Sequence, residues 1–468
     1  MKIFERVLQK KIMKYLEENN YISCSQHGFR KGRSCLSELL AHFTNLYENL
    51  GNCSDSDTVY LDFSKAFDKV DHALLIKKLQ KYGFGGKLLK WIEAFLSNHT
   101  QKVVIDGKVS ETIFVISGVP QGTVLGPLLF LLFVNDMELC IKHSNLKLFA
   151  DDSRLTKDIN PEVPDADQDF LQQDLNAILD WAISNNMILN EKKFQLLVHR
   201  VHKHAPNRNM RLLQQLPFAD YETSRSYSLP NNQVLDESDL VTDLGISVPN
   251  GFIFEAHINQ IAKKANLKCS WILSVFRCRQ EHAMMTLFRS LVLSILEYCS
   301  ALWSPHRVQD ISKLEGVQRR FTSKISSISH LNYWDRLKRL NLMSLQRRRE
   351  RFQMIYVWKV LNDKVPNDFD ITYNDSLRRG KTIVIPTMPS RIAKINTTYD
   401  TSFKVHAARL WNCLSIEVKS ATSLDVFKKR LDIFLLGLPD CPPVPGYSTL
   451  NSNSVLDWLS SNIDIYTM

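Results

Sequence analysis

Two short apolar runs that each end in aspartate constrain this chain more than any other feature of its sequence. The run 59–61 is rich in strand-forming residues and is followed at once by Asp62, and the run 146–150 is followed by Asp151 and Asp152. Taken singly, each aspartate is typical of a turn or a helix N-cap. Together they place negative charge at the ends of two buried strands, which is costly unless a cation lies beside them.

Converging carboxylates of this kind suit the chemistry of divalent metal ions. Phosphoryl transfer by two metal ions requires carboxylates that hold two Mg²⁺ about 4 Å apart. We expect the strand that ends at Asp62 to pair antiparallel with a hairpin that carries Asp151 and Asp152 at its tip. That pairing would bring the three side chains to one place, as ligands of two Mg²⁺ ions, with Mn²⁺ as an alternative.

Composition limits the class of protein. A chain of 468 residues exceeds the ~250–300 residues of one ordinary core, so we expect two or three domains. The formal net charge of +10 favours a polyanionic partner. Nine scattered cysteines without a C-x-x-C pair indicate reduced thiols, and no signal peptide or apolar run of ~18 residues is visible. These features predict an intracellular protein, nuclear or cytoplasmic, that is neither secreted nor embedded in a membrane.

The order of helix and strand patterns predicts an α+β fold. Two amphipathic helices flank a Gly-Arg loop at 28–33, and the strand at 59–61 follows them. Alternating apolar residues around Asp106-Gly107 indicate a hairpin. A helix at 123–136, the hairpin at 146–152 and a helix at 169–184 complete a split βαβ pattern. We expect a long connection at 199–239 and a mainly helical region beyond 254 that contains bunched arginines.

Several motifs in this order resemble the reverse transcriptases of non-LTR (LINE-type) retrotransposons. The principal ones are Y-L-D-F-S-K-A-F-D (60–68), S-G-V-P-Q-G-T-V-L-G-P-L-L-F (117–130) and F-A-D-D (149–152). H-G-F-R-K-G-R-S (27–34) precedes them and L-N-E-K-K (189–193) follows. Downstream, D-L-G-I (243–246), S-I-L-E-Y (294–298), L-W-S-P (302–305), L-E-G-V-Q-R-R (314–320) and A-A-R-L-W-N (407–412) extend the resemblance over nearly the whole chain.

The resemblance implies an RNA-directed DNA polymerase, a nucleotidyltransferase that adds deoxynucleotides to a primer 3′-hydroxyl. Its partners would be an RNA template, a DNA primer and deoxynucleoside triphosphates. The implied architecture is a right-hand polymerase palm with partial fingers and a thumb-like domain. The boundaries expected are 1–55 for partial fingers, 56–248 for the palm, 249–365 for a helical basic thumb and 366–468 for a region without an assigned role. Such proteins usually carry further segments before the H-G-F-R loop, so we expect an N-terminally truncated copy.

The resemblance also assigns roles to individual residues. Metal ligands would be Asp62, Asp151 and Asp152, and Lys193 would protonate the leaving pyrophosphate. Phe194 stands where the family commonly has threonine, which leaves the register between Lys192 and Lys193 open. The nucleotide would be bound by Arg30, Arg33, Phe67, Gln121 and Gly122.

Phe67 would lie beneath the incoming sugar and exclude a 2′-hydroxyl, although an isolated phenylalanine is more often a core residue. The glycines at 118 and 122 also fit a plain turn before a helix, and the two loop arginines also fit a solvated loop. Among the bunched arginines of the helical region, Arg319, Arg320, Arg347 and Arg348 would bind nucleic-acid phosphates. Charge runs are also typical of solvated helix faces.

Three other interpretations remain. The chain could be an inactive remnant that only binds nucleic acid, or a polymerase of related palm architecture that makes RNA. It could also be an unrelated α+β protein whose aspartates are accidental, in which case Asp62 and Asp151 would lie far apart.

Overall fold

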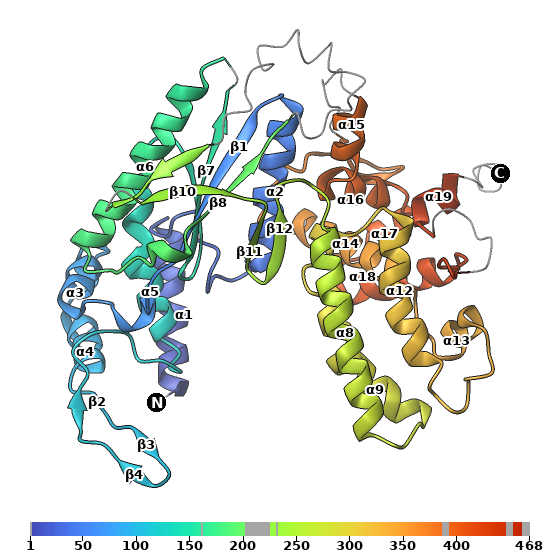
Figure 1. The fold of residues 1–468 in the computed structure, drawn as a ribbon, viewed down its shortest axis with the longest axis horizontal. Coiled ribbons are helices and arrows are strands. Elements are labelled where there is room, and N and C mark those ends of the chain that lie inside the picture. The colour runs from blue at the N-terminus through green and yellow to red at the C-terminus, as the bar shows by residue number, and fades with distance from the viewer. Residues whose placement is uncertain are drawn as a thin grey trace. The chain divides into compact units, whose positions relative to one another are not determined.

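Two units make up the part of the chain that the computed structural model describes, which is residues 2–160, 162–201, 225–230, 233–385, 393–445 and 453–460 (Figure 1). The first unit comprises 1–38, 54–201 and 207–239, and the second comprises 39–53, 202–206 and 240–468. Within those described stretches, no helix has both the length and the apolar character needed to cross a bilayer.

A six-stranded sheet forms the centre of the first unit (Figure 1). Its strand order is β6-β7-β1-β8-β10-β9, and neighbours run antiparallel except β8 and β10, which are parallel. The strands are β1 (Asp55–Leu61), β6 (Asn145–Phe149), β7 (Asp152–Ile159), β8 (Gln195–His199), β9 (Ser226–Ser228) and β10 (Val234–Ser238).

The two faces of this sheet differ because side chains alternate along each strand. Val59, Leu61 and Leu155 belong to an apolar core shared with helices α1, α3, α4, α5 and α6. The opposite side of the strands is polar but buried, with the Thr58 and Thr156 hydroxyls 3.2 Å apart. The helices are α1 (Lys2–Glu18), α3 (His72–Lys81), α4 (Gly86–Leu96), α5 (Gly126–Val134) and α6 (Pro164–Ser184), with short 3₁₀ turns at Ala66–Asp68, Asn135–Cys140 and Glu191–Lys193.

Helix α5 is buried all round. Every residue from 128 to 134 is apolar and at most 1% exposed, so this helix is the centre of the core rather than an amphipathic cover. Its N-cap residue, Leu125, has no capping side chain, but the Gly126 amide donates to the Thr123 hydroxyl at 3.1 Å. In addition, the buried Glu5 carboxylate of α1 accepts hydrogen bonds from the Val124 and Leu125 amides, at 2.7 and 3.3 Å. This contact stabilises the helix N-terminus from a distant part of the chain.

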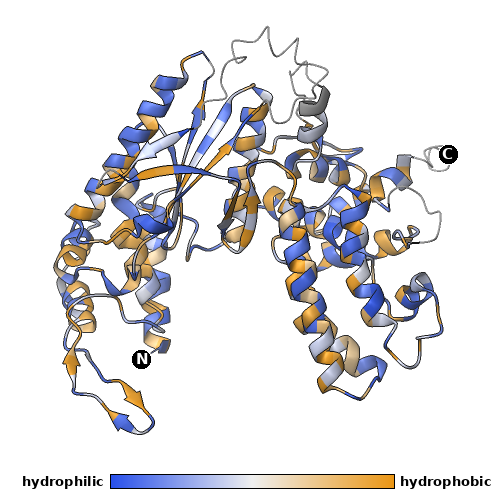
Figure 2. Cartoon of the chain, in the orientation of Figure 1, coloured by the Kyte–Doolittle hydropathy of each residue, from blue (hydrophilic) through white to orange (hydrophobic). Residues whose placement is uncertain are grey.

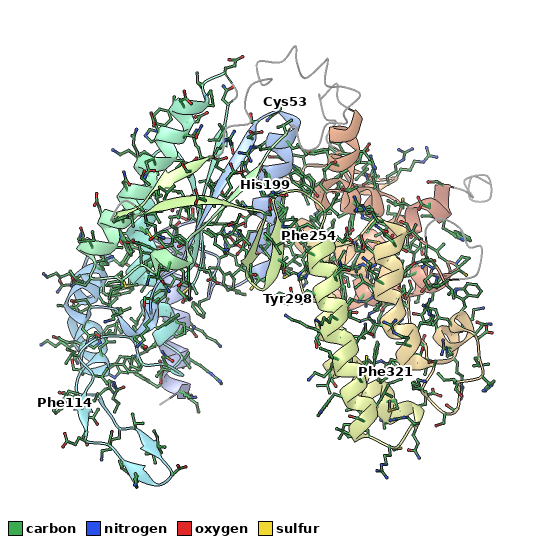
Figure 3. All side chains as sticks on the ribbon, viewed as in Figure 1. Cys53, Phe114, His199, Phe254, Tyr298 and Phe321 are labelled. Carbon is green, nitrogen blue, oxygen red and sulfur yellow. The ribbon has the colours of Figure 1, made fainter. Side chains whose placement is uncertain are left out.

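The second unit is mainly helical, as Figure 3 shows around the labelled Phe254 and Phe321. Helix α2 (Cys35–Gly51) enters it after Glu38, where Tyr47 and Phe252 pack with ring centroids 4.4 Å apart. The other elements are β11 (Leu240–Asp243), β12 (Ile246–Pro249), α8 (Glu255–Val275), α9 (Glu281–Leu291), α10 (Leu293–Glu297), α11 (Ser300–Trp303), α12 (Val308–Thr322), α13 (Tyr333–Arg339), α14 (Leu345–Leu361), β13 (Tyr373–Ser376), β14 (Gly380–Ile383), α15 (Ala393–Asp400), α16 (Phe403–Asn412), α17 (Ile416–Lys419), α18 (Leu424–Leu436) and α19 (Val455–Ser460).

The α+β prediction is confirmed, and so is the antiparallel pairing expected between the strand before Asp62 and the hairpin at 146–152. The Asp106-Gly107 hairpin is also present, as the ribbon of β2 (Thr100–Gln101), β3 (Val104–Ile105), β4 (Lys108–Val109) and β5 (Ile113–Phe114). The expectation of a long connection at 199–239 is wrong in part. Strands β9 and β10 lie within it and extend the sheet, while 202–224 and 231–232 fall outside the described residues.

A matched pair of leucines tests the central position of α5. Leu129 is 1% exposed in α5, and Leu139 is 83% exposed ten residues later in the adjoining 3₁₀ turn. We expect Leu129→Ala to lower the free energy of unfolding by about 2–5 kcal/mol because it leaves a cavity in the core. Leu139→Ala should change it by less than about 0.5 kcal/mol. Urea unfolding followed by circular dichroism measures both, and equal effects would contradict the assigned core.

Candidate active site

Strand pairing brings the three predicted carboxylates to one end of the sheet. In the register of β1 with β7, Leu61 lies opposite Ser153, so Asp62 follows Leu61 at the place where Asp152 precedes Ser153. Phe149 pairs with Asp152, which leaves Ala150 and Asp151 as the two-residue turn of the hairpin. The side chains therefore come from one strand end and one hairpin tip, as the sequence predicts.

The carboxylates influence one another electrostatically. The pKa of Asp152 is raised above its usual value, first by burial and then by the negative charges of Asp151 and Asp62. Arg154 and Lys193 oppose that shift. The Lys193 ammonium lies 3.2 Å from Asp62 Oδ2, and its side chain is 64% exposed. The site thus concentrates negative charge, which the exposed Lys193 and the buried Arg154 partly offset.

The donor chemistry of this site fits a hard divalent cation. Carboxylate oxygens are the ligands that Mg²⁺ prefers, and a cation would relieve the repulsion that raises the pKa of Asp152. Across the described ranges, no three His, Cys, Asp or Glu side chains are already gathered as a set that could hold a metal ion. The three aspartates are therefore neighbours whose side chains would have to turn toward a common ion.

A glycine loop is docked against the segment that follows β1. Gly118 has φ 91°, and a Cβ at this position would lie 2.8 Å from the Asp68 Cα and carbonyl oxygen. The Gly118 amide donates to the Val70 carbonyl at 2.8 Å. The Gln121 side-chain amide donates to Asp68 Oδ1 at 2.8 Å. Gly122 has φ 75° with open space around it, so conformation rather than crowding favours glycine there.

Phe67 lies between the core and this loop. Its ring is half-buried, stacks on Phe130 with centroids 4.3 Å apart, and meets Phe29 edge-on at 6.3 Å. Its carbonyl accepts a hydrogen bond from the Val119 amide at 2.8 Å. The side chain is thus held in place on one side by the core, while part of it stays accessible near the strand end that bears Asp62.

The Gly-Arg loop carries the two arginines that are predicted to bind phosphate. Both of them contact other groups of the protein. Arg30 donates to the carbonyls of Ser23 and Gln26, at 2.8 and 3.3 Å. Arg33 lies 2.8 Å from His27 Nε2. Both guanidinium groups are half-buried, so any role in binding a triphosphate would use their remaining N–H groups or a rearrangement.

Gln26 connects this loop to the carboxylate turn, a role that the sequence did not signal. Gln26 is fully buried, and its Oε1 accepts hydrogen bonds from the amides of Gly28 (2.7 Å) and Ala150 (3.3 Å). The His27 amide donates to the Leu148 carbonyl at 2.8 Å. A Cβ at Gly28 would lie 2.4 Å from the Ala150 nitrogen, so glycine permits the close approach. The turn that carries Asp151 is thereby fixed to the loop that carries Arg30.

The bunched arginines of the second unit have different surroundings. Arg320 is exposed and donates to Asn266 at 2.8 Å, and Arg319 is half-buried beside it. Both line a groove of about 460 Å³ between α8 and α12, together with Lys263 and Lys313.

The other two predicted arginines are engaged within the protein. Arg347 is 1% exposed and donates to the Pro439 carbonyl at 2.8 Å. Arg348 forms an ion pair with Glu297. The burial of Arg347 and the ion pair of Arg348 therefore separate these two positions from the pair at 319 and 320, although all four belong to similar basic runs. The sequence pattern could not distinguish them, because the helices that surround α14 are distant from it along the chain.

Comparison with known proteins finds matches among reverse transcriptases. Residues 1–227, just under half of the chain, match the family model described as reverse transcriptase (RNA-dependent DNA polymerase). The chain is 24% identical over 335 residues to the RNA-directed DNA polymerase from mobile element jockey of Drosophila melanogaster. It is 23% identical over 337 residues to the probable RNA-directed DNA polymerase from transposon X-element of the same organism.

Each of these two alignments covers 69% of the chain and 34% of the relative, so the chain spans about one third of the length of these relatives. A polyprotein of the type-1 retrotransposable element R2 of Popillia japonica is 26% identical over 141 residues, 27% of this chain and 23% of that one. Among solved structures, apo telomerase from Candida tropicalis overlaps 79% of this chain and 55% of its own, with 9% identity and a TM-score of 0.40.

The buried His27 predicts a pH dependence of stability. Burial and the nearby charges of Arg33, Lys147, Arg154 and Arg30 lower the pKa of His27 to about 2. In the unfolded chain this histidine titrates near ~6.5. The stability that the neutral ring contributes is therefore complete above about pH 6.5 and is lost as the pH falls, because only the unfolded chain binds the proton.

We expect the wild-type free energy of unfolding to fall by about 2 kcal/mol more than that of His27→Gln between about pH 7 and pH 5. Urea unfolding at both pH values measures the difference. His330→Gln, at an exposed position, is the control and should keep the wild-type slope. A His27→Gln slope equal to that of the wild type would contradict the assignment.

Proposed function

We propose that this chain carries the polymerase activity of a non-LTR retrotransposon, copying an RNA template into DNA by adding deoxynucleotides to a primer 3′-hydroxyl. The observation that carries the proposal is the position of Asp62 beside Asp152 and Asp151, at the paired ends of β1 and β7. The family match supports the class of reaction. The names of the relatives support an RNA template and a DNA product.

In this proposal Asp62, Asp151 and Asp152 hold two Mg²⁺ ions, or Mn²⁺ in their place. Bound there, the ions would activate the primer hydroxyl and neutralise charge on the leaving pyrophosphate. Burial is the first cause of the raised pKa of Asp152, and the negative charges of Asp151 and Asp62 add to it; a cation would offset that charge repulsion, which supports the assignment. Asp62 remains close to Lys193, so a cation would compete with that lysine for the same carboxylate.

Lys193 is the proposed proton donor to the pyrophosphate. Its ammonium lies 3.2 Å from Asp62 Oδ2 and its side chain is largely exposed, so the group is near the site and free to swing on its flexible stem. This contact supports Lys193 over Lys192 in the open register. General acid assistance by a positioned ammonium lowers the barrier for departure of a charged leaving group.

The proposed nucleotide site combines the two loops around the aspartates. Gln121 and Gly122 would contact the incoming nucleotide, with Gln121 oriented by Asp68. Phe67 would exclude a 2′-hydroxyl by its bulk, and its stacking on Phe130 supports a fixed ring. Arg30 and Arg33 would approach the triphosphate, since guanidinium groups match phosphate oxygens in geometry and charge.

The proposed contact with primer and template uses the groove between α8 and α12. Its cationic lining includes Arg319, Arg320, Lys263 and Lys313, and phosphates attract such clusters without regard to sequence. We propose this contact within a helical thumb-like domain at 249–365. The palm at 56–248, partial fingers at 1–55 and the region 366–468 complete the proposed division.

A second candidate function is binding of nucleic acid without catalysis. The observation that favours it is that the basic groove is built wholly from residues of the second unit. The groove can therefore bind phosphates whether or not the carboxylate site is catalytically active. Salt-dependent binding of a primer–template duplex without extension would select this alternative.

Primer extension with an RNA template, a DNA primer, Mg²⁺ and deoxynucleotides tests the proposed activity. We expect extension by the wild-type chain and a loss of about 1000-fold or more in Asp151→Asn, because metal-assisted charge stabilisation contributes several kcal/mol. Asp169→Asn, the same change at an exposed position on α6, should retain wild-type activity. Absence of wild-type extension, or equal activity in the two variants, would overturn the proposal.

Sugar selection tests the role of Phe67. We expect Phe67→Val to raise ribonucleotide incorporation relative to deoxyribonucleotide incorporation by about 10- to 100-fold, because removal of a steric clash is typically worth a few kcal/mol. Phe67→Tyr keeps the ring and should keep the wild-type preference. Single-nucleotide extension with each sugar gives the ratio. Wild-type selectivity in Phe67→Val would leave Phe67 as a core residue only.

A further inference from the structure

Residues 99–116 form an apolar ribbon that carries hydrophobic side chains into solvent. It contains β2, β3, β4 and β5, and Figure 2 shows hydrophobic colour along its strands. Figure 3 labels Phe114 where the ribbon leaves the helices of the first unit. Seven large apolar side chains on it are 55–85% exposed: Val103, Val104, Ile105, Val109, Ile113, Phe114 and Ile116.

The ribbon is regular β-structure. Asp106 and Gly107 form its two-residue turn with φ 48° and 78°, the left-handed pair that matches the twist of a hairpin. The Ser110 amide donates to the Val103 carbonyl at 2.9 Å, and the Val115 amide donates to the His99 carbonyl at 2.8 Å. Isolated two-stranded ribbons are marginally stable in water. A partner that pairs with a ribbon whose two faces are apolar would therefore increase its stability.

Charge and backbone direction indicate what kind of partner fits. The charges of the four charged side chains, Lys102, Asp106, Lys108 and Glu111, sum to zero, so the ribbon has no net attraction to a polyanion such as nucleic acid or an anionic membrane.

The backbone direction shows which edge is open. The Val103 carbonyl points inward to Ser110, and hydrogen-bonding groups alternate along a strand. The N–H and C=O of Val104 therefore face the open edge, where another strand can pair.

The sequence around Val104 is complementary to itself when the strand is reversed. If two copies of 102–106 pair antiparallel with Val104 opposite Val104, Val103 faces Ile105 of the other copy. Lys102 then lies next to Asp106, the residue at which the strand enters its turn, and this pair of opposite charges occurs twice. Directly opposed side chains of opposite charge stabilise antiparallel pairs, whereas like charges destabilise them.

We propose that the apolar ribbon is a dimerisation element, in which the β3 edge pairs with the β3 edge of a second copy of this chain about a two-fold axis at Val104. The pairing continues the ribbon into a four-stranded sheet and brings the valine and isoleucine side chains of β3 beside those of the second copy. A two-fold interface needs a patch that is complementary to itself, which the reversed charge pattern provides. The dimer is independent of the polymerase activity, since no ribbon residue is part of the carboxylate site.

Sedimentation velocity of the full chain over a concentration series tests the proposal. We expect a discrete monomer–dimer equilibrium. Lys102→Asp places aspartate opposite Asp106 twice and should raise the dissociation constant by about 10-fold or more. Adding Asp106→Lys restores opposite charges and should return the constant to within about 3-fold of the wild type. Lys108→Asp makes the same change in net charge on the other strand and should have little effect.

A backbone variant distinguishes edge pairing from non-specific hydrophobic association. Val104→Pro removes only an outward N–H from an edge strand, a position where proline is tolerated, and should abolish the dimer while circular dichroism stays unchanged. A chain that stays monomeric at all concentrations, or forms polydisperse aggregates without a dimer, overturns the proposal. It is also overturned if Lys102→Asp and its charge-reversed double variant associate alike.

Discussion

The antiparallel register of β1 with β7 is the constraint on which the rest of the site depends. Leu61 opposite Ser153 places Asp62 beside the hairpin tip that carries Asp151 and Asp152. A shift of one residue would turn Val59 and Leu61 from the apolar core to the polar face, so burial of the core fixes the register. The same packing that stabilises the sheet thereby positions the carboxylates. Burial, together with the charges of Asp151 and Asp62, raises the pKa of Asp152 there.

Two close backbone approaches tie loops to this strand end. Gly118 lies against Asp68, and Gly28 lies against Ala150, each at a distance that no side chain could occupy. Gln26 adds buried hydrogen bonds between the second loop and the turn. Because the glycines are required by contact and not only by turn geometry, these loops are parts of the site and not flexible connections. The positions of Gln121 and Arg30 follow from the loops that carry them.

Basic residues in similar sequence runs differ in how far the fold buries them. Arg319 and Arg320 lie on α12 beside a groove, whereas Arg347 lies on α14 and donates to backbone carbonyls. Helix α14 also buries Glu350, which accepts from the Ser454 hydroxyl at 2.6 Å, and Gln353, whose Oε1 lies 2.7 Å from His406 Nδ1. A run of arginines therefore indicates either a surface for phosphates or an internal network.

The sequence by itself determined the fold class, the strand that ends at Asp62, the hairpin at Asp151 and Asp152, and the turn at Asp106-Gly107, because these depend on local periodicity and turn chemistry. The sequence missed β9 and β10, which depend on pairing with β8 rather than on their own weak pattern. It could not foresee the role of Gln26 or the burial of Arg347, since an ordinary glutamine or arginine carries no sign of its neighbours. Only the tertiary structure decided which polar side chains meet, because those contacts join segments that are distant along the chain.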